Sequence, residues 1–280
     1  MKSSITRLLC TAFIFLCVPF STKGQGAIDE ADLRALALER SIYTTTSPFE
    51  QSGLLMEKYY LRKGQGLYTE ALGELARIHA YTLGEKIGNY YYEKSLCHYL
   101  LGDFTQALAT TKEASFYIAP ADTTSLRELH LIEALAAAQC GQWQRSAEAA
   151  RGFIECDSTL SPQQRQESLT QLEKLYASTP KLRNPMVAWW LSMIPGVGQF
   201  YAGEWFSGTV SMVVNGALIG FTAAEWMAGE WLSGWIVGCG GLSTTYFVGQ
   251  ERARHLVEQR NRRVINQYNE KIKAILLPND

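Results

Sequence analysis

The last third of the chain carries three apolar runs that contain no charged residue, and this feature restricts the fold more than any other. The runs cover residues 186–201, 208–224 and 231–249, so each is 16–19 residues long. A membrane-spanning helix needs about 20 predominantly apolar residues. Six of the seven tryptophans lie between Trp189 and Trp235, and tryptophan favours the membrane–water interface. We therefore expect three membrane-spanning segments; the alternative is a soluble hydrophobic bundle.

The first run is interrupted by Pro195, Gly196 and Gly198. Proline costs a helix interior about 3 kcal/mol and each glycine about 1 kcal/mol, and irregular backbone persists in lipid only where protein covers it. We expect a kink or short turn packed against the next two runs in a compact mini-bundle. Small residues allow helices to approach closely, and such faces are expected at Gly216, Gly220, Gly234, Gly238 and Gly241.

The residues around this break resemble a known kind of membrane domain. The segment AWWLSMIPGVGQFYAG resembles the start of the small two-transmembrane (TM-two) domain family. It is more similar to a related bacterial domain of unknown function with a Pro-Gly-x-Gly-Gln-x-Tyr-x-Gly core. The resemblance covers about residues 184–250 and implies membrane residence, but no reaction. The membrane-domain motif consists of Pro195, Gly196, Gly198, Gln199, Tyr201 and Gly203.

This chain departs from the TM-two family at one informative position. That family usually has Asp-Arg before its Phe-Tyr pair, whereas this chain has Gly198 and Gln199 there. No role of the charged pair is therefore transferred to this protein.

Three segments upstream of the apolar runs align as an internal repeat: KGQGLYTEALGELARI, LLGDFTQALATTKEA and QCGQWQRSAEAARGF. Each places a glycine two residues before an aromatic residue, and the glycines are 36 and 39 residues apart. We expect the glycine to end one helix, the aromatic to fill the wedge at the start of the next, and a small alanine to allow close approach. The aligned positions are Gly66, Tyr68 and Ala71; Gly102, Phe104 and Ala107; and Gly141, Trp143 and, one place late, Ala147.

This spacing is close to the 34-residue period of the tetratricopeptide repeat, and the chain resembles that family over roughly residues 45–160. A generic array of helical hairpins is the alternative. Ser47 and Ser161 each precede a proline, with Glu or Gln three residues on, which predicts helix N-termini. Residues 162–177 are expected to form a terminal capping helix, and residues 28–42 a helix at the other end.

The predicted fold is therefore all-α. A helical-hairpin (TPR-like) array over residues 27–177 is followed by a linker at 178–185, a small transmembrane helical bundle at 186–249, and a basic amphipathic helix at 250–280. Repeat arrays bind partners along their first helices, and tyrosines with a few polar groups suit protein recognition. The alternative is that these tyrosines pack between repeats. The predicted partner-binding groove consists of Tyr60, Lys63, Asn89, Tyr92, Tyr99, Glu128 and Leu131.

The N-terminus predicts export. Residues 1–24 contain a basic start, an apolar run and a small-residue end, which is typical of a secretory signal peptide; the alternative is an uncleaved anchor or a buried helix. The repeat domain is then expected in the periplasm and the chain in the inner membrane of a bacterium. The tail from 250 to 280 holds more basic than acidic residues, so the positive-inside rule places it in the cytoplasm after three crossings. If the broken run is re-entrant, two crossings remain and the tail is periplasmic.

No pattern of residues indicates catalysis. The four histidines are scattered, and no nucleophile motif, phosphate loop or zinc spacing is present. Four cysteines follow the signal peptide, Cys97, Cys140, Cys156 and Cys239, and are expected to be small core residues. Net charge is −1, which gives no indication of nucleic-acid binding. We expect no enzyme, no cofactor and no metal.

The expected function is a membrane-anchored helical-repeat scaffold that binds a protein partner in the cell envelope. The alternative is a small membrane transporter or lipid-handling protein with a regulatory repeat domain. The expected partners are an unidentified protein and membrane lipid, and a homo-oligomer formed through the membrane domain is left open.

Overall fold

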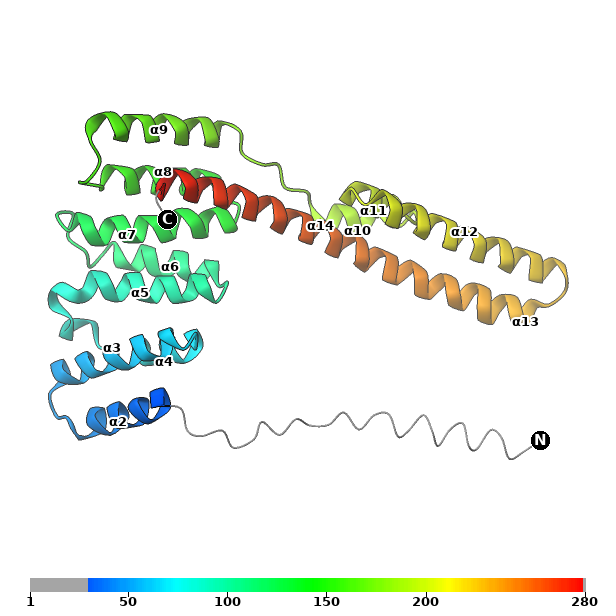
Figure 1. The fold of residues 1–280 in the computed structure, drawn as a ribbon. Coiled ribbons are helices and arrows are strands. Elements are labelled where there is room, and N and C mark those ends of the chain that lie inside the picture. The colour runs from blue at the N-terminus through cyan, green and yellow to red at the C-terminus, as the bar shows by residue number, and fades with distance from the viewer. Residues whose placement is uncertain (1–29, 279–280) are drawn as a thin grey trace. The chain divides into compact units, whose positions relative to one another are not determined.

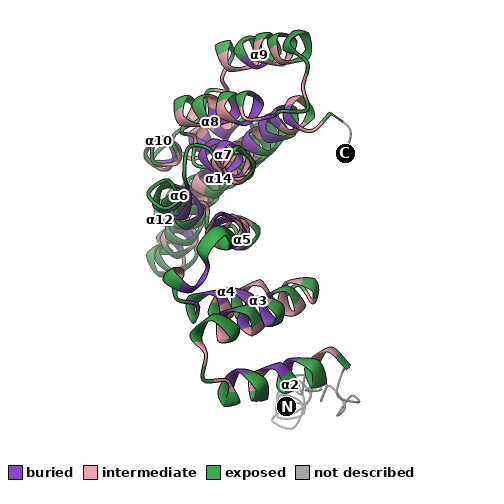
Figure 2. Ribbon diagram, turned by 90° about the vertical axis from the view of Figure 1, so that its left-hand side faces the viewer, coloured by how far each residue is buried: buried purple, intermediate pink, exposed green. Residues whose placement is uncertain are grey.

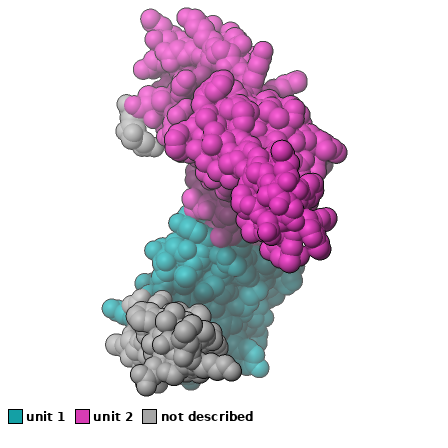
Figure 3. Space-filling view, turned by 90° about the vertical axis from the view of Figure 1, so that its right-hand side faces the viewer, with its two compact units in different colours: residues 1–83 teal, residues 84–280 magenta. Residues whose placement is uncertain are grey.

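The computed structural model describes residues 30–278, and every regular element in that part of the chain is helical (Figure 1). The prediction of an all-α fold is thus confirmed for these residues, whereas the predicted signal peptide lies outside them. The chain divides into two compact units, Met1–Leu83 and Gly84–Asp280, coloured separately in Figure 3. This division falls inside the segment predicted as one repeat domain, at two short 3-10 helices that separate the hairpins around Gly66 and Gly102.

The first unit is built from α2 (Glu30–Thr44), α3 (Pro48–Gly64), α4 (Tyr68–Ala76) and the 3-10 helix η2 (Ala80–Thr82). Helix α3 packs against both α2 and α4. Its N-terminus is capped as predicted, because the side chain of Ser47 accepts a hydrogen bond from the backbone N–H of Glu50. The buried core contains Leu38, Leu55 and Leu75.

The second unit begins with the 3-10 helix η3 and five α-helices: η3 (Gly84–Lys86), α5 (Ile87–Leu100), α6 (Phe104–Ala114), α7 (Thr123–Gln139), α8 (Trp143–Glu155) and α9 (Pro162–Ala177). Each of these α-helices packs against the next one in sequence, and α5 also contacts α7. Helix α9 has the predicted bounds, and Ser161 and Gln164 form the complete reciprocal capping box.

The three repeat glycines form turns of the same geometry. Gly66, Gly102 and Gly141 have φ angles of 76°, 78° and 70°, in the left-handed region that favours glycine. In each turn the residue after the glycine donates its backbone N–H to the carbonyl five residues earlier, at 3.0, 2.9 and 2.8 Å. This is the Schellman arrangement, which satisfies the last carbonyls of a helix. The next helix then begins at the aligned aromatic residue, as predicted.

The small residue of the third repeat is a serine rather than the predicted Ala147. Ala71 and Ala107 are fully buried five residues after their glycines, and Ser146 is fully buried at the same offset from Gly141. Serine is nearly as small as alanine, and its hydroxyl is satisfied by donating to the carbonyl of Ala134 at 2.7 Å. In all three repeats, the buried small residue therefore follows the turn glycine by five positions.

The C-terminal part of the second unit begins with two short helices and continues with two longer helical segments, which lie side by side (Figure 1). The broken apolar run forms α10 and α11, which are too short to cross a membrane. By length and composition, α12 is the one helix among residues 30–278 that could cross a bilayer. The elements are α10 (Pro185–Leu191), α11 (Val197–Ala202), α12 (Trp205–Met227), α13 (Trp231–Ser233), the π-helical η4 (Gly234–Cys239) and α14 (Gly240–Leu276).

Glycines of the third run make the close contacts that were predicted for them. A Cβ at Gly234 would lie 2.6 Å from the ring of Trp226, and one at Gly241 would lie 3.1 Å from Leu218. The prediction is wrong for Gly216 and Gly220, because a Cβ at either position would meet nothing within 4 Å. The packing of α12 on the third run therefore uses a different face of α12.

Helix α14 continues beyond the apolar run and packs against α7, α8 and α9. Its fully buried Ile272, together with Tyr268 and Leu276, joins one hydrophobic cluster with Phe153 and Leu172 of the preceding helices. A segment that packs on these helices must lie on the same side of any membrane as they do. The side of a membrane on which the tail lies stays a prediction.

Candidate binding surface and membrane-domain motif

The seven residues of the predicted groove are divided between the two units. Tyr60 and Lys63 lie on α3 of the first unit, where Tyr60 is 43% exposed. The ammonium group of Lys63 lies 5.8 Å from the centroid of the Tyr60 ring, within cation–π range. The other five residues lie in the second unit, on α5 and α7, so the structure does not describe the seven as one groove. These five are Asn89, Tyr92, Tyr99, Glu128 and Leu131.

Three of these five are partly buried and pack against hydrophobic clusters. Tyr92 packs against the hydrophobic cluster that contains Ile132, and Tyr99 packs against that cluster and against the cluster around Ile272. Leu131 packs on the same cluster as Ile272. Burial raises the pKa of the Tyr92 phenol, with a further contribution from the Glu128 carboxylate. These contacts are consistent with the alternative interpretation, in which the tyrosines pack between repeats, and the groove stays a prediction.

Glu128 lies next to a second carboxylate. Burial raises the pKa of Glu128, and the negative charge of Glu93 on α5 raises it further. Glu93 itself is only 5% exposed. This electrostatic interaction between α5 and α7 was not apparent from the sequence, because the two residues are 35 positions apart.

The end of α14 covers part of the α7 surface on which the groove was predicted. The Tyr268 hydroxyl donates to the backbone carbonyl of Leu175 at 3.0 Å. The Asn269 amide donates to the carbonyl of Leu135 at 3.4 Å, and the Gln139 amide donates to Asn266 at 3.2 Å. A segment of the chain itself therefore occupies a surface that the sequence assigned to a partner.

An aromatic cluster holds α14 at this position. The ring of Tyr268 meets Trp143 edge-on at 5.1 Å between centroids, and meets Tyr176 at 5.8 Å. The Tyr176 hydroxyl lies 2.6 Å from Ser146 Oγ, and burial raises the pKa of Tyr176 to about 12. The repeat aromatic Trp143 thus packs against the tail, a contact that no local pattern could predict.

The glycines of the membrane-domain motif are required by their geometry. Gly196 and Gly203 have φ angles of 90° and 93° and flank α11. Gly198 has an ordinary φ, but a Cβ there would overlap the carbonyl oxygen of Ala188 and Ser192 Oγ. The break after Pro195 therefore lets α11 fold back on α10, as the expected short turn.

The polar residues of the motif join α11 to distant parts of the chain. Gln199 is 1% exposed and donates from its amide to the carbonyl of Gly249 at 3.1 Å. Tyr201 accepts a bond from the backbone N–H of Asn184 at its hydroxyl, and its own carbonyl accepts from the Arg183 guanidinium. The motif residues on α11 therefore form hydrogen bonds with both the predicted linker and α14.

The predicted linker is held by hydrogen bonds at its C-terminal end. The backbone N–H of Arg183 donates to the Asn261 side chain at 3.0 Å, and the Asn261 amide donates to the Arg183 carbonyl at 2.7 Å. The guanidinium of Arg183 also lies 5.5 Å from the centroid of the Tyr201 ring. This reciprocal pair fixes the chain before α10 against α14.

Buried polar groups line the contact between α11, α12 and α14. Thr245 Oγ1 donates to Asn215 Oδ1 at 2.8 Å, and Asn215 is almost fully buried. The Gln199 Oε1 atom is buried without a hydrogen-bond partner. These residues surround a space that does not admit a water molecule.

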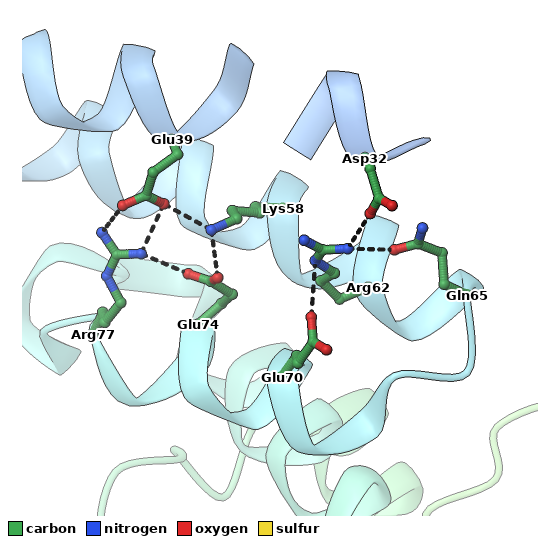
Figure 4. Close-up of polar contacts among 8 residues, drawn as sticks. All are labelled: Asp32, Glu39, Lys58, Arg62, Gln65, Glu70, Glu74 and Arg77. Carbon is green, nitrogen blue, oxygen red and sulfur yellow. Dashed lines mark hydrogen bonds and ion pairs between the residues drawn. The ribbon is translucent and has the colours of Figure 1, made fainter. Parts of the chain in front are cut away.

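A separate network of charges stabilises the first unit (Figure 4). The Arg77 guanidinium binds both carboxylate oxygens of Glu39 at 2.9 Å, and Lys58 bridges Glu39 and Glu74 at 2.7 and 2.6 Å. The hydrogen bonds from Arg77 and Lys58 lower the pKa of Glu39 to about 2. Because these residues come from α2, α3 and α4, the network fixes the three helices to one another.

The cysteine prediction holds for one of the four thiols. Cys97 is buried, whereas Cys140 is exposed and Cys156 and Cys239 are half-buried. Within residues 30–278, no three or more His, Cys, Asp or Glu side chains are grouped as a metal site would require.

Comparisons with known proteins gave no match: no family model, curated protein or solved structure is similar to this chain.

Proposed function

We propose that this protein is a membrane-anchored helical-repeat scaffold that binds a protein partner in the bacterial cell envelope. The single observation that carries the proposal is the combination of repeated Schellman turns at Gly66, Gly102 and Gly141 with an α12 that could span a bilayer. Shared turn geometry supports a TPR-like array, and such arrays act as extended binding surfaces.

The distribution of burial supports membrane residence of α10 to α14. Helix α12 buries Gly208, Asn215 and Thr222, while most of its large apolar residues are exposed. Figure 2 colours each helix by the burial of its residues. Val213 and Ile219 are 63% and 56% exposed. Exposed apolar surface of this extent marks a contact with lipid or protein, and a helix with polar and small residues inside and apolar residues outside suits a lipid environment.

The proposed topology has two crossings. Helix α12 forms the first. Residues 231–249 form the second, as an apolar segment that is divided among α13, η4 and the start of α14. The packing of α14 on α7, α8 and α9 supports a topology in which the repeats and the tail lie on one side of the membrane. The turn at Gly229 lies on the other. With the predicted signal peptide, the shared side is the periplasm.

A partner test uses the groove residue that is exposed in the structure. Photo-crosslinking from position 60 in cells is expected to capture a defined protein, and Tyr60→Ala should reduce co-purification of that protein. Tyr43→Ala is the matched control, because Tyr43 is 91% exposed in the same unit and lies outside the predicted groove. Equal loss of the partner in both variants, or in neither, argues against recognition through Tyr60.

A second candidate function, a small transporter, is favoured by one observation. Discontinuous helices and buried polar groups within a membrane domain are features of transporter binding sites, and Gln199 and Asn215 are buried beside the break at Gly196. Proteoliposomes that contain the full chain should then show a solute flux that Asn215→Leu abolishes. Absence of flux in both proteins removes this candidate and leaves the scaffold.

A further inference from the structure

The two ends of the α12–α14 hairpin differ in charge. At the end near the repeats, residues 178–184 and 250–263 contain seven Lys or Arg and only two acidic residues, Glu251 and Glu258. At the other end, residues 225–230 contain two glutamates and no basic residue. Between Arg183 and Arg252 the sequence contains no Lys or Arg at all.

Several basic groups at the repeat end have no acidic partner within the described residues. Arg254 pairs with both Glu251 and Glu258 at 2.8 and 3.6 Å, which uses the two available acids. The Arg260 Nη1 atom is buried and has no hydrogen-bond acceptor. Within residues 178–184 and 250–263, the exposed Lys and Arg residues that take part in no ion pair are Lys181, Arg252, Arg262 and Arg263.

Helix α10 presents an apolar face at the same level of α14. Ala188 is buried against Ala253 and Val257, so α10 lies beside the turn of α14 that contains Arg252. The outward side chains of α10 and the following turn are large and apolar, and Trp190 and Ile194 are 57% and 63% exposed. No other described part of the chain covers these side chains.

An apolar face that is bordered by free basic side chains is the pattern of an element that lies in a membrane interface. The apolar residues enter the acyl boundary, while Lys and Arg contact anionic headgroups. Seven-residue α10 reaches only about 10 Å along its axis, so it cannot cross the bilayer, and an interfacial position explains both its length and its exposed tryptophan.

We propose that α10 and the basic residues around Lys181 and Arg252 form a binding surface for anionic phospholipid headgroups on the side of the repeats. The proposal rests on the membrane residence proposed above and adds the class of lipid and the residues that select it. The occupant is a phospholipid rather than a free anion, because the basic groups border an apolar face that a free anion cannot cover.

The test measures lipid selectivity of the full chain in mild detergent. Native mass spectrometry after incubation with equal amounts of phosphatidylglycerol and phosphatidylcholine should show preferential retention of phosphatidylglycerol. The double variant Lys181→Gln with Arg252→Gln should lower this preference by about fivefold for each charge removed, and added salt should lower it further. The control is Arg151→Gln with Lys271→Gln, which changes the net charge equally on helices α8 and α14 away from α10.

Three outcomes overturn the proposal. The first is equal retention of both lipids by the wild-type chain, and the second is an equal loss of preference in the double variant and the control. The third is full displacement of phosphatidylglycerol by inorganic phosphate, which indicates a free-anion site. Each of these results leaves membrane residence intact, whereas a chain that stays soluble without detergent contradicts the proposed function itself.

Discussion

The contact between α14 and the repeat helices predicts a large effect of Ile272→Ala. Ile272 is fully buried in the cluster formed with α7, α8 and α9. Removing its three outer carbons loses about 0.8 kcal/mol for each buried methylene, and the cavity left behind raises the cost of an Ile→Ala change to between about 2 and 5 kcal/mol. We expect a loss of about 3 kcal/mol in the free energy of unfolding, since the site is closed on all sides.

The assay is thermal unfolding of the full chain in detergent, followed by helical circular dichroism and by tryptic cleavage in the tail. A loss of about 3 kcal/mol lowers the midpoint by roughly 6–12 °C for a unit of this size, and trypsin should cut after Arg262 earlier than in the wild type. Lys271→Ala is the matched control, because Lys271 is the preceding, exposed residue. A loss under about 0.5 kcal/mol in Ile272→Ala, equal to that of an ordinary surface change, refutes the docking of α14.

Three further predictions concern other parts of the chain. Gly102→Ala should destabilise the second unit by about 1 kcal/mol in a denaturant titration, because φ is 78° there; no change would contradict the Schellman turn. Gly198→Val should prevent α11 from folding against α10 and abolish recovery of monodisperse protein in detergent, whereas Gly220→Val, where a Cβ meets open space, should not. The pKa of Glu39 is lowered to about 2 from an ordinary 4.5, so its ionised carboxylate contributes stability that is present above pH 4.5 and is lost as pH falls toward 2. The difference in free energy of unfolding between wild type and Glu39→Gln should therefore shrink over that window, and a constant difference is the contrary result.

Local sequence signals predicted the helices well. The bounds of α9 follow from Ser161, Pro162 and Gln164, because an N-cap, a first-turn proline and a capping box all act within four residues. The starts of α4, α6 and α8 follow from the glycine–aromatic spacing for the same reason. The short turn at Gly196 was also predictable, since proline and glycine restrict the backbone locally.

Long-range packing was the part that the sequence did not reveal. Residues 250–280 were predicted as an amphipathic helix, but periodicity does not tell whether its apolar face, which contains Tyr268 and Ile272, packs on lipid, on a second copy or on α7. The same limit applies to Tyr92 and Tyr99, whose types suit recognition and packing equally. The register of Ser146 was missed because only alanine was considered as the small residue.

The central claim is that the repeats and the tail lie on one side of the membrane, and cysteine labelling tests it most directly. Each labelled chain carries a single cysteine, and its other cysteines are replaced by serine. The native, exposed Cys140 reports the accessibility of the repeats. Arg262→Cys reports that of the tail, and Ala228→Cys reports that of the turn of the hairpin. A membrane-impermeant maleimide applied to spheroplasts should label Cys140 and position 262 together and leave position 228 unlabelled until the membrane is opened. Labelling of Cys140 with protection of position 262 would contradict the account.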